Sequence, residues 1–144
     1  MSDSLPDVAA AAAQRLQAVQ QRIHQACLTA GRPADSVRLL AVSKTFGAEH
    51  VKALAQAGQT AFGENYLQEG VDKITHLAAS PNSPSLEWHF IGPIQSNKTR
   101  PIAEHFDWVH SVDRLKIAQR LCEQRPDTLG PLNVLIQINT SGED

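Results

Sequence analysis

Short apolar segments alternate with segments that favour helix along most of this chain. The strand-like segments lie at 37–44, 60–66, 87–92, 107–113 and 133–140. The helical segments between them lie at 48–58, 67–80, 95–105 and 114–124. Near-continuous apolar strands separated by short helices are typical of a parallel sheet covered by helices. The pattern therefore predicts an α/β fold with right-handed crossovers between successive strands.

The spacing of these strands leaves two architectures open. They begin about every 24 residues, a pitch at which eight βα units would need about 190 residues. The chain has 144 residues and stops after the fifth strand-like segment. We therefore expect either a five-stranded open α/β domain or the first five strands of a (β/α)8 barrel. The pattern alone does not choose between them.

A long amphipathic helix is predicted ahead of the first strand, over residues 7–30. Its apolar face is expected to consist of Leu16, Val19, Ile23, Ala26 and Cys27, which recur at helical spacing. Gly31 suits the position just after the last helical turn, and Pro33 prevents continuation.

Composition and charge exclude several classes of function. Hydrophobic residues make up 42% of the chain and the formal net charge is −2, so a dedicated nucleic-acid or anionic-membrane surface is not expected. No apolar run is long enough to span a bilayer. The first residues do not resemble an export signal, which favours a cytoplasmic location. Cys27 and Cys122 lack metal-like spacing and are expected to be free thiols, with a disulfide or a catalytic thiol as the less favoured alternatives.

Functional groups in parallel α/β folds gather where the strands end. Lys44 follows the first predicted strand, on the same face as Leu40 and Val42. A lysine in that place would be partly desolvated, which lowers its pKa and frees the amine to attack an aldehyde. Pattern alone favours the simpler interpretation, in which the side chain extends into solvent.

The second strand ends in Gly63, Glu64 and Asn65. Gly63 would allow a flat ligand or another backbone to approach closely, and Asn65 shares its face. Glu64 could orient a nearby cation or suit the N-terminal end of the following helix. An ordinary turn after a strand explains the same residues.

His89 lies within the third predicted strand, and His110 near the end of the fourth. A lone histidine in a strand is more often a hydrogen-bonded structural residue than a ligand or a base. The polar residues 95–98 could bind an anion at a helix start, or simply be solvated. The histidines lack the spacing of a metal site, so none is expected. Phosphate-loop, dinucleotide-binding and nucleophile-elbow motifs are also missing from the sequence.

Five motifs, in this order and spacing, closely resemble the pyridoxal phosphate homeostasis protein family. They are AVSKT (41–45), FGENYLQEGVDKI (62–74), WHFIGPIQSNK (88–98), HSVD (110–113) and NVLIQINTS (133–141). The resemblance covers the chain from about residue 37 to its end. It implies a (β/α)8 barrel similar to the N-terminal domain of alanine racemase, of which this chain holds about five strands after a leading helix. The expected organisation is a single domain, with a helix in 1–36 packed on a partial barrel in 37–144.

The resemblance also implies a cofactor and its site. Lys44 would hold pyridoxal 5′-phosphate (PLP) as an internal Schiff base, Asn65 would neighbour the cofactor ring, and His89 would line the pocket. The implied role is non-catalytic PLP binding in vitamin B6 and amino-acid homeostasis. PLP itself and PLP-dependent apoenzymes are the expected partners, and nucleic acid and membranes are not.

Two alternatives to this function stay open. One is a PLP-dependent amino-acid racemase of the alanine racemase type, although the five strand ends supply no clear second base. The other is a fragment that lacks function by itself. Exchange of the α-proton of an added amino acid in heavy water would distinguish the racemase from the binding protein.

Overall fold

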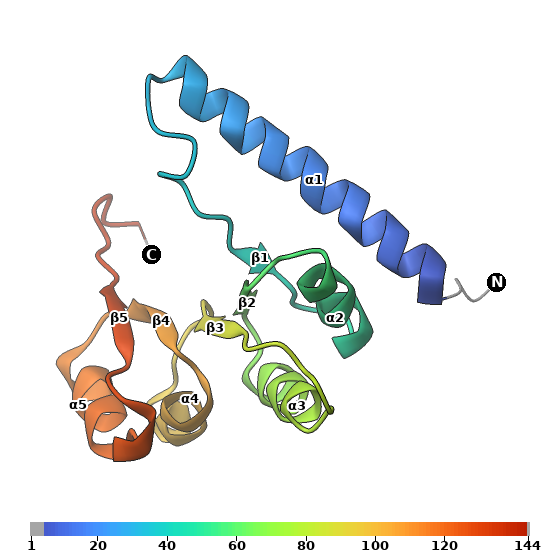
Figure 1. The fold of residues 1–144 in the computed structure, drawn as a ribbon. Coiled ribbons are helices and arrows are strands. Elements are labelled where there is room, and N and C mark those ends of the chain that lie inside the picture. The colour runs from blue at the N-terminus through green and yellow to red at the C-terminus, as the bar shows by residue number, and fades with distance from the viewer. Residues whose placement is uncertain (1–4, 144) are drawn as a thin grey trace.

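The computed structural model describes residues 5–143, so residues 1–4 and 144 of the predicted segments lie outside the described part. Helices and parallel strands alternate as the sequence predicts (Figure 1). The helices are α1 (Leu5–Thr29), α2 (Ala48–Gln56), α3 (Leu67–Ala78), α4 (Thr99–His105) and α5 (Leu115–Gln124). The strands are β1 (Ala41–Val42), β2 (Ala61–Glu64), β3 (Glu87–Phe90), β4 (Trp108–Val112) and β5 (Asn133–Ile136). Short 3₁₀ turns lie at Ser96–Lys98 and Asp127–Leu129.

The order of the strands decides between the two expected architectures. Each strand pairs in parallel with the next one along the chain, in the order β1-β2-β3-β4-β5. A doubly wound open sheet reverses direction at a switch point, whereas the wall of a barrel adds strands in sequence. The described residues therefore form part of a (β/α)8-type barrel, with α2 to α5 along the same side of the strands (Figure 1).

The hydrophobic core lies between the strands and these helices. Phe62 and Phe90 project from the sheet, and Phe106 and Ile117 come from the helical side; each is at most 2% exposed. The Phe90 and Phe106 rings meet edge to face with centroids 5.3 Å apart, a favoured aromatic arrangement. On α3 the residues facing this core recur at helical spacing: Leu67, Val71, Ile74 and Leu77. The helix that the sequence predicts over 67–80 thus has an apolar face packed on the core.

The register places a second set of residues on the opposite face of the sheet. Val42 pairs with Gly63, Gly63 with His89, and His89 with Trp108. Register partners in a parallel sheet point to the same side, and neighbours along each strand point to the other. Since Phe62 and Phe90 face the helices, this row faces away from them, toward the inside of the barrel wall. We call this the inner face.

The two edge strands are shorter than the sequence predicts. β1 covers only Ala41–Val42 of the predicted 37–44, and β5 covers Asn133–Ile136 of the predicted 133–140. Each has a paired neighbour on one side only among the described residues. Ile136 and Ile138 are 77% and 73% exposed. Apolar β-rich sequence favours extended backbone, but only a partner strand turns it into a ladder.

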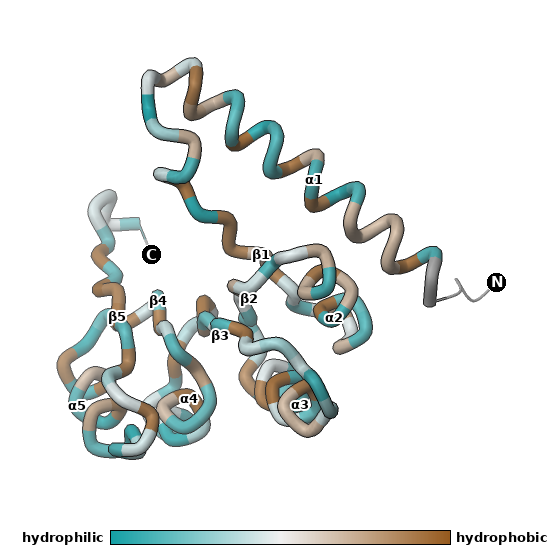
Figure 2. The backbone as a smooth tube through the Cα atoms, viewed as in Figure 1, coloured by the Kyte–Doolittle hydropathy of each residue, from teal (hydrophilic) through white to brown (hydrophobic). Residues whose placement is uncertain are grey.

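The leading helix α1 has a narrower buried face than predicted. Leu16 and Cys27 are buried and Ile23 is half-buried, but Val19 is 40% exposed and Ala26 is exposed. The helix contacts α2, and hydrophobic and hydrophilic residues are interspersed along it (Figure 2). The prediction for Val19 and Ala26 was wrong because this contact covers only part of the apolar stripe. The division of the chain into a packed leading helix and a barrel part stays a prediction.

The cysteines and the helices agree with two simpler expectations. Cys27 and Cys122 are both free thiols, one buried and the other exposed. Within residues 5–143, no helix combines the length and apolar character needed to cross a membrane.

Candidate functional site at the carboxyl ends of the strands

Lys44 lies two residues beyond the end of β1. The ladder continues past that end, because the Ser43 amide donates to the Gly63 carbonyl at 3.0 Å. Asn65 lies one residue beyond the end of β2, the neighbouring strand, so the alternation of side chains continued past both strand ends would bring Lys44 and Asn65 to the inner face. Lys44 is exposed, which agrees with the simpler interpretation that the sequence pattern favours and not with the partly desolvated alternative, because none of the described helices covers the inner face.

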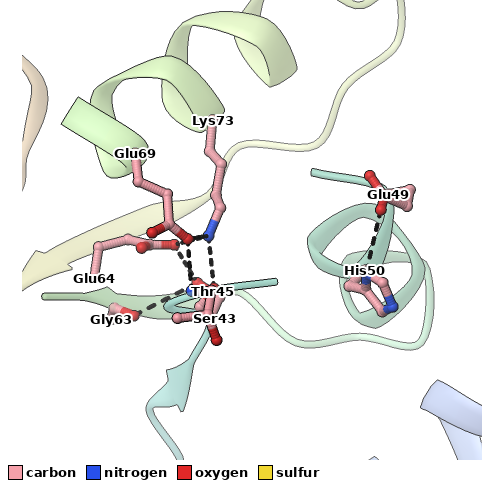
Figure 3. A network of polar contacts seen from close by, with 8 residues as sticks. All are labelled: Ser43, Thr45, Glu49, His50, Gly63, Glu64, Glu69 and Lys73. Atoms are coloured by element: carbon pink, nitrogen blue, oxygen red, sulfur yellow. Dashed lines mark hydrogen bonds and ion pairs between the residues drawn. The ribbon is translucent and has the colours of Figure 1, made fainter. Parts of the chain in front are cut away.

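An ionic network around Lys73 contacts Ser43 and Thr45, the residues on either side of Lys44 (Figure 3). The ammonium of Lys73, on α3, donates to Glu64 Oε1 at 2.8 Å, to Glu69 Oε1 at 2.8 Å and to the Ser43 carbonyl at 2.6 Å. The side chains of Lys73 and Glu64 are 7% and 0% exposed. The hydroxyl of Ser43 also donates to Glu64 Oε1, at 2.7 Å. Lys73 is thus the cation that Glu64 pairs with, and the pair is bonded to the residue before Lys44.

The same network reaches the residue after Lys44. The backbone N–H of Thr45 donates to Glu69 Oε1 at 2.5 Å. Thr45 has a φ of 66°, in the left-handed region that a β-branched residue rarely adopts. The hydrogen bond from Lys73 holds the pKa of Glu69 below its ordinary value; the Thr45 bond and the Lys73 charge add to this, while partial burial opposes it. Glu69 is therefore a charged acceptor over the ordinary pH range.

Asn65 follows β2 and carries a buried polar atom without a partner. Its Oδ1 is shielded from solvent and has no hydrogen-bond donor among the described residues. A Cβ added at Gly92 would overlap the Asn65 carbonyl oxygen, so only glycine allows the two backbones to approach this closely. A Cβ at Gly63 would meet Ile91 and Leu40 side chains at 3.2 and 3.4 Å. Buried polar atoms are normally satisfied, so the orphan oxygen indicates a place for a polar group.

His89 is buried on the inner face and belongs to a chain of polar side chains. Its Nε2 lies 2.7 Å from Glu87 Oε1, and its Nδ1 lies 2.8 Å from His110 Nε2. Arg38 lies 3.2 Å from the same Glu87 oxygen. The His89 ring stacks on Trp108 with centroids 5.5 Å apart. His89 thus has the hydrogen-bonded structural environment that the sequence favoured, on the face where Lys44 and Asn65 lie.

The geometry restricts the protonation of the two histidines. A neutral His89 donates through Nε2 to the Glu87 carboxylate, so its Nδ1 accepts the Nε2–H of His110. Burial lowers the pKa of His110, and the positive charge that His89 can carry lowers it further. Burial is the largest single influence on the pKa of Glu87 and raises it. The hydrogen bonds with His89 and Arg38 and the charges of these two residues together outweigh burial, so the pKa of Glu87 is lowered.

A pH dependence of stability follows from His110. Because its pKa is lower in the folded chain, the unfolded chain takes up this proton more readily as the pH falls. Its contribution to the free energy of unfolding is complete above the unfolded pKa of about 6.5 and is lost as the pH falls through the lower folded pKa. We expect urea unfolding to show a fall in stability between about pH 7.5 and 5.5. The His110→Gln variant should show a shallower fall, and equal slopes would contradict the assignment.

A cleft of about 460 Å³ lies between the start of α3 and the β3–α4 connection. It is lined by Asn65 and Tyr66 on one side and by Ile94, Gln95 and Lys98 on the other. Gln95 and Lys98 belong to the polar segment that the sequence suggested for anion binding. Of the three predicted cofactor-binding residues, Asn65 lines this cleft, whereas Lys44 and His89 do not.

Sequence reasoning missed three members of the site. His110 lies near the end of the fourth predicted strand, where the sequence pattern assigns it no role. Extending the register of His89 with Trp108 places it level with Lys44. Glu69 and Lys73 were read as part of an ordinary helix. Their spacing of four residues is a signal for an ion pair, but it did not reveal that both reach the segment around Lys44.

Comparison with known sequences identifies relatives of this chain. The sequence profile described as "Alanine racemase, N-terminal domain" matches residues 14–143. The pyridoxal phosphate homeostasis protein of Vibrio alginolyticus is 66% identical over 113 residues, which make up 78% of this chain and 48% of that protein. The protein of the same name from Pasteurella multocida is 61% identical over 131 residues, or 91% and 55% of the two chains. The chain spans about half the length of the curated relatives it matches.

Two solved structures resemble the fold. PipY of Synechococcus elongatus with PLP bound is 38% identical, with a TM-score of 0.69 over 83% of this chain and 55% of that one. A protein of unknown function from Bifidobacterium adolescentis is 29% identical, with a TM-score of 0.77 over 100% of this chain and 60% of that one. Both likenesses agree with the barrel-type strand order.

Proposed function

Because the chain belongs to the alanine racemase N-terminal domain family, we propose that it binds PLP through Lys44 and serves vitamin B6 and amino-acid homeostasis. The names of its relatives and the PLP-bound state of PipY support this proposal. The observation in this chain that supports it is that Lys44 and Asn65 follow the ends of the adjacent parallel strands β1 and β2, two residues and one residue beyond them.

The chemistry of Lys44 suits an aldehyde cofactor. PLP supplies an aldehyde that condenses with a primary amine. Lys44 would supply that amine, and its condensation with the aldehyde carbon would release the aldehyde oxygen as water with the two amine hydrogens. The exposed position of Lys44 leaves its amine accessible to the cofactor.

The neighbouring residues fit a flat, polar ligand. Asn65 carries the orphan oxygen Oδ1, and its amide offers both a donor and an acceptor to a ring substituent. Gly63 has no side chain of its own, and the Leu40 and Ile91 side chains pack within 3.2–3.4 Å of where its Cβ would lie, so they supply apolar surface beside this strand end. His89 and His110 form a polar boundary on the following strands. We therefore assign Lys44, Asn65 and His89 as the residues that would hold the cofactor.

The proposed role is binding without catalytic turnover. The names of the curated relatives describe homeostasis and support this interpretation. PLP-dependent apoenzymes as recipients of PLP, and a cytoplasmic location, remain proposals. A racemase would remove the α-proton of an added L-amino acid, so catalytic exchange of that proton in heavy water would contradict the binding-only role.

Trapping with borohydride tests the proposal directly. The purified chain is mixed with PLP, reduced and digested, and the modified lysines are located by mass spectrometry. The candidates are Lys44, Lys52, Lys73, Lys98 and Lys116. We expect label on Lys44 at low PLP, its loss in Lys44→Arg and its retention in Lys52→Arg. Label spread over the exposed lysines, or no label, would contradict PLP binding by this chain.

A further inference from the structure

We propose that Glu69, supported by Lys73 and Glu64, positions Lys44 by holding the backbone on both sides of it. The inference rests on the proposed PLP-binding function and adds to it a second layer of residues that do not touch the cofactor. It assigns a role to a buried ion pair that the condensation itself does not use.

The residue before Lys44 is held by hydrogen bonds at its amide, its hydroxyl and its carbonyl oxygen, which also accepts from the Phe46 N–H at 3.2 Å. Lys73 donates to the Ser43 carbonyl, Ser43 donates its hydroxyl to Glu64, and its amide continues the ladder to Gly63. Ser43 is 4% exposed. Because Ser43 is turned toward α3, the alternation of side chains along the chain directs Lys44 to the opposite, inner face. These bonds therefore set the face on which Lys44 begins.

Thr45, the residue after Lys44, is held in a backbone conformation that threonine rarely adopts. A β-branched residue at a φ of 66° is strained, and such strain persists only where surrounding contacts enforce it. Two contacts do so here: the turn bond from the Phe46 N–H to the Ser43 carbonyl at 3.2 Å, and the bond from the Thr45 amide to the Glu69 carboxylate, a charged acceptor. Without Glu69 we expect Thr45 to relax to negative φ, which changes the direction in which the chain leaves Lys44.

Helix α3 connects the two halves of this arrangement. Glu69 and Lys73 lie one helical turn apart and are bonded to each other, so one helix holds both Ser43 and Thr45. Between them, a Cβ at Gly70 would lie 3.2 Å from Glu64 Cβ and 3.1 Å from Phe106 Cζ. The glycine thus lets Glu64 pack under the helix where Lys73 reaches it (Figure 3).

The test compares three variants on α3. Glu69→Ala removes the acceptor, Glu69→Gln keeps an acceptor oxygen without the charge, and Asp72→Ala removes one exposed acid from the same helix. The first readout, made without PLP, is hydrogen exchange of the Thr45 amide. The second is the ratio of reductive PLP label on Lys44 to label on Lys52. The free energy of unfolding of each variant is measured alongside.

We expect Glu69→Ala to speed exchange at Thr45 and to lower the labelling ratio about tenfold, the size of one lost hydrogen bond to a charged group. Glu69→Gln should recover most of the ratio, and Asp72→Ala should match the wild type. Faster exchange with an unchanged ratio would overturn the positioning role. No selective label on wild-type Lys44 would instead contradict the proposed function itself, so the two failures are distinguishable.

A second substitution distinguishes an effect of the Thr45 backbone conformation from a general loss of structure. Glycine adopts positive φ without strain, so Thr45→Gly in the Glu69→Ala background should recover part of the labelling ratio. Recovery from a change made at Thr45 would show that the backbone conformation matters. If the ratio fell further, or did not change, the proposed link between φ at Thr45 and the direction of Lys44 would be wrong.

Discussion

Replacing Lys73 with methionine should lower the free energy of unfolding by about 3–5 kcal/mol, the usual cost of leaving a buried charge without its partner. Glu64 is fully buried and would retain only the Ser43 hydroxyl as a donor to Oε1, while its Oε2 already has no partner among the described residues. Methionine keeps much of the length of lysine, so packing is changed little. Urea-induced unfolding, followed by the fluorescence of Trp88 and Trp108, measures the difference.

Two matched variants test whether the loss of stability comes from leaving the buried charge of Glu64 without its partner. Lys52→Met removes an exposed lysine from α2 and should change stability by no more than about 0.5 kcal/mol. The double variant Lys73→Met with Glu64→Gln removes both charges and should recover much of the loss, since the amide still accepts from Ser43. If Lys73→Met alone were as mild as Lys52→Met, the pair would be solvated and its buried character wrong.

Replacing Gly92 with alanine should destabilise the fold by about 3 kcal/mol, the upper end of the range for overpacking, and should also disturb Asn65. The new Cβ would overlap the Asn65 carbonyl oxygen and would lie 3.0 Å from its carbonyl carbon and 3.1 Å from its Cα. These are backbone atoms, so the clash cannot be relieved by rotating a side chain. The displaced segment follows β2 directly and carries the side chain that we assign to the cofactor. Selective labelling of Lys44 should therefore fall together with stability.

Gly47→Ala provides the control for adding a methyl group. Gly47 has a φ of −74°, which alanine adopts readily, and the added Cβ would meet only the Glu49 carboxylate, an exposed and flexible group. We expect a change in stability of no more than about 0.5 kcal/mol. Similar effects at both glycines would mean that the approach of Gly92 to Asn65 is not tight in solution.

Local pattern was sufficient to predict the elements of the fold. The helix-favouring segment 67–80 predicts a helix, and α3 covers Leu67–Ala78 with Leu67, Val71, Ile74 and Leu77 toward the core. The apolar run 87–92 predicted β3, which covers Glu87–Phe90. Periodicity works for such segments because it reports which face is buried, and burial decides whether the element forms.

The candidate site was only partly visible in the same way. Motif resemblance singled out Lys44, Asn65 and His89. The register places His89 on the inner face, and Lys44 and Asn65 lie just beyond the ends of β1 and β2. The partners of these residues were not visible. Lys73 lies 30 positions from Ser43, and His110 lies 21 positions from His89, so nothing local indicates either contact. Such pairs exist only because crossovers bring distant segments together.

The sequence by itself determined where strands and helices form, because alternation and helical spacing are properties of neighbouring residues. It also placed a lysine at the end of an apolar strand. Only the tertiary structure decided that the strands pair in sequential order, and so that the sheet is a barrel wall and not a doubly wound sheet. It likewise decided that Thr45 takes a left-handed conformation, which its own side chain disfavours. The physical reason is that strand neighbours are selected by contacts between distant residues, and the φ of Thr45 by such a contact with Glu69 together with the local turn bond from Phe46 to Ser43.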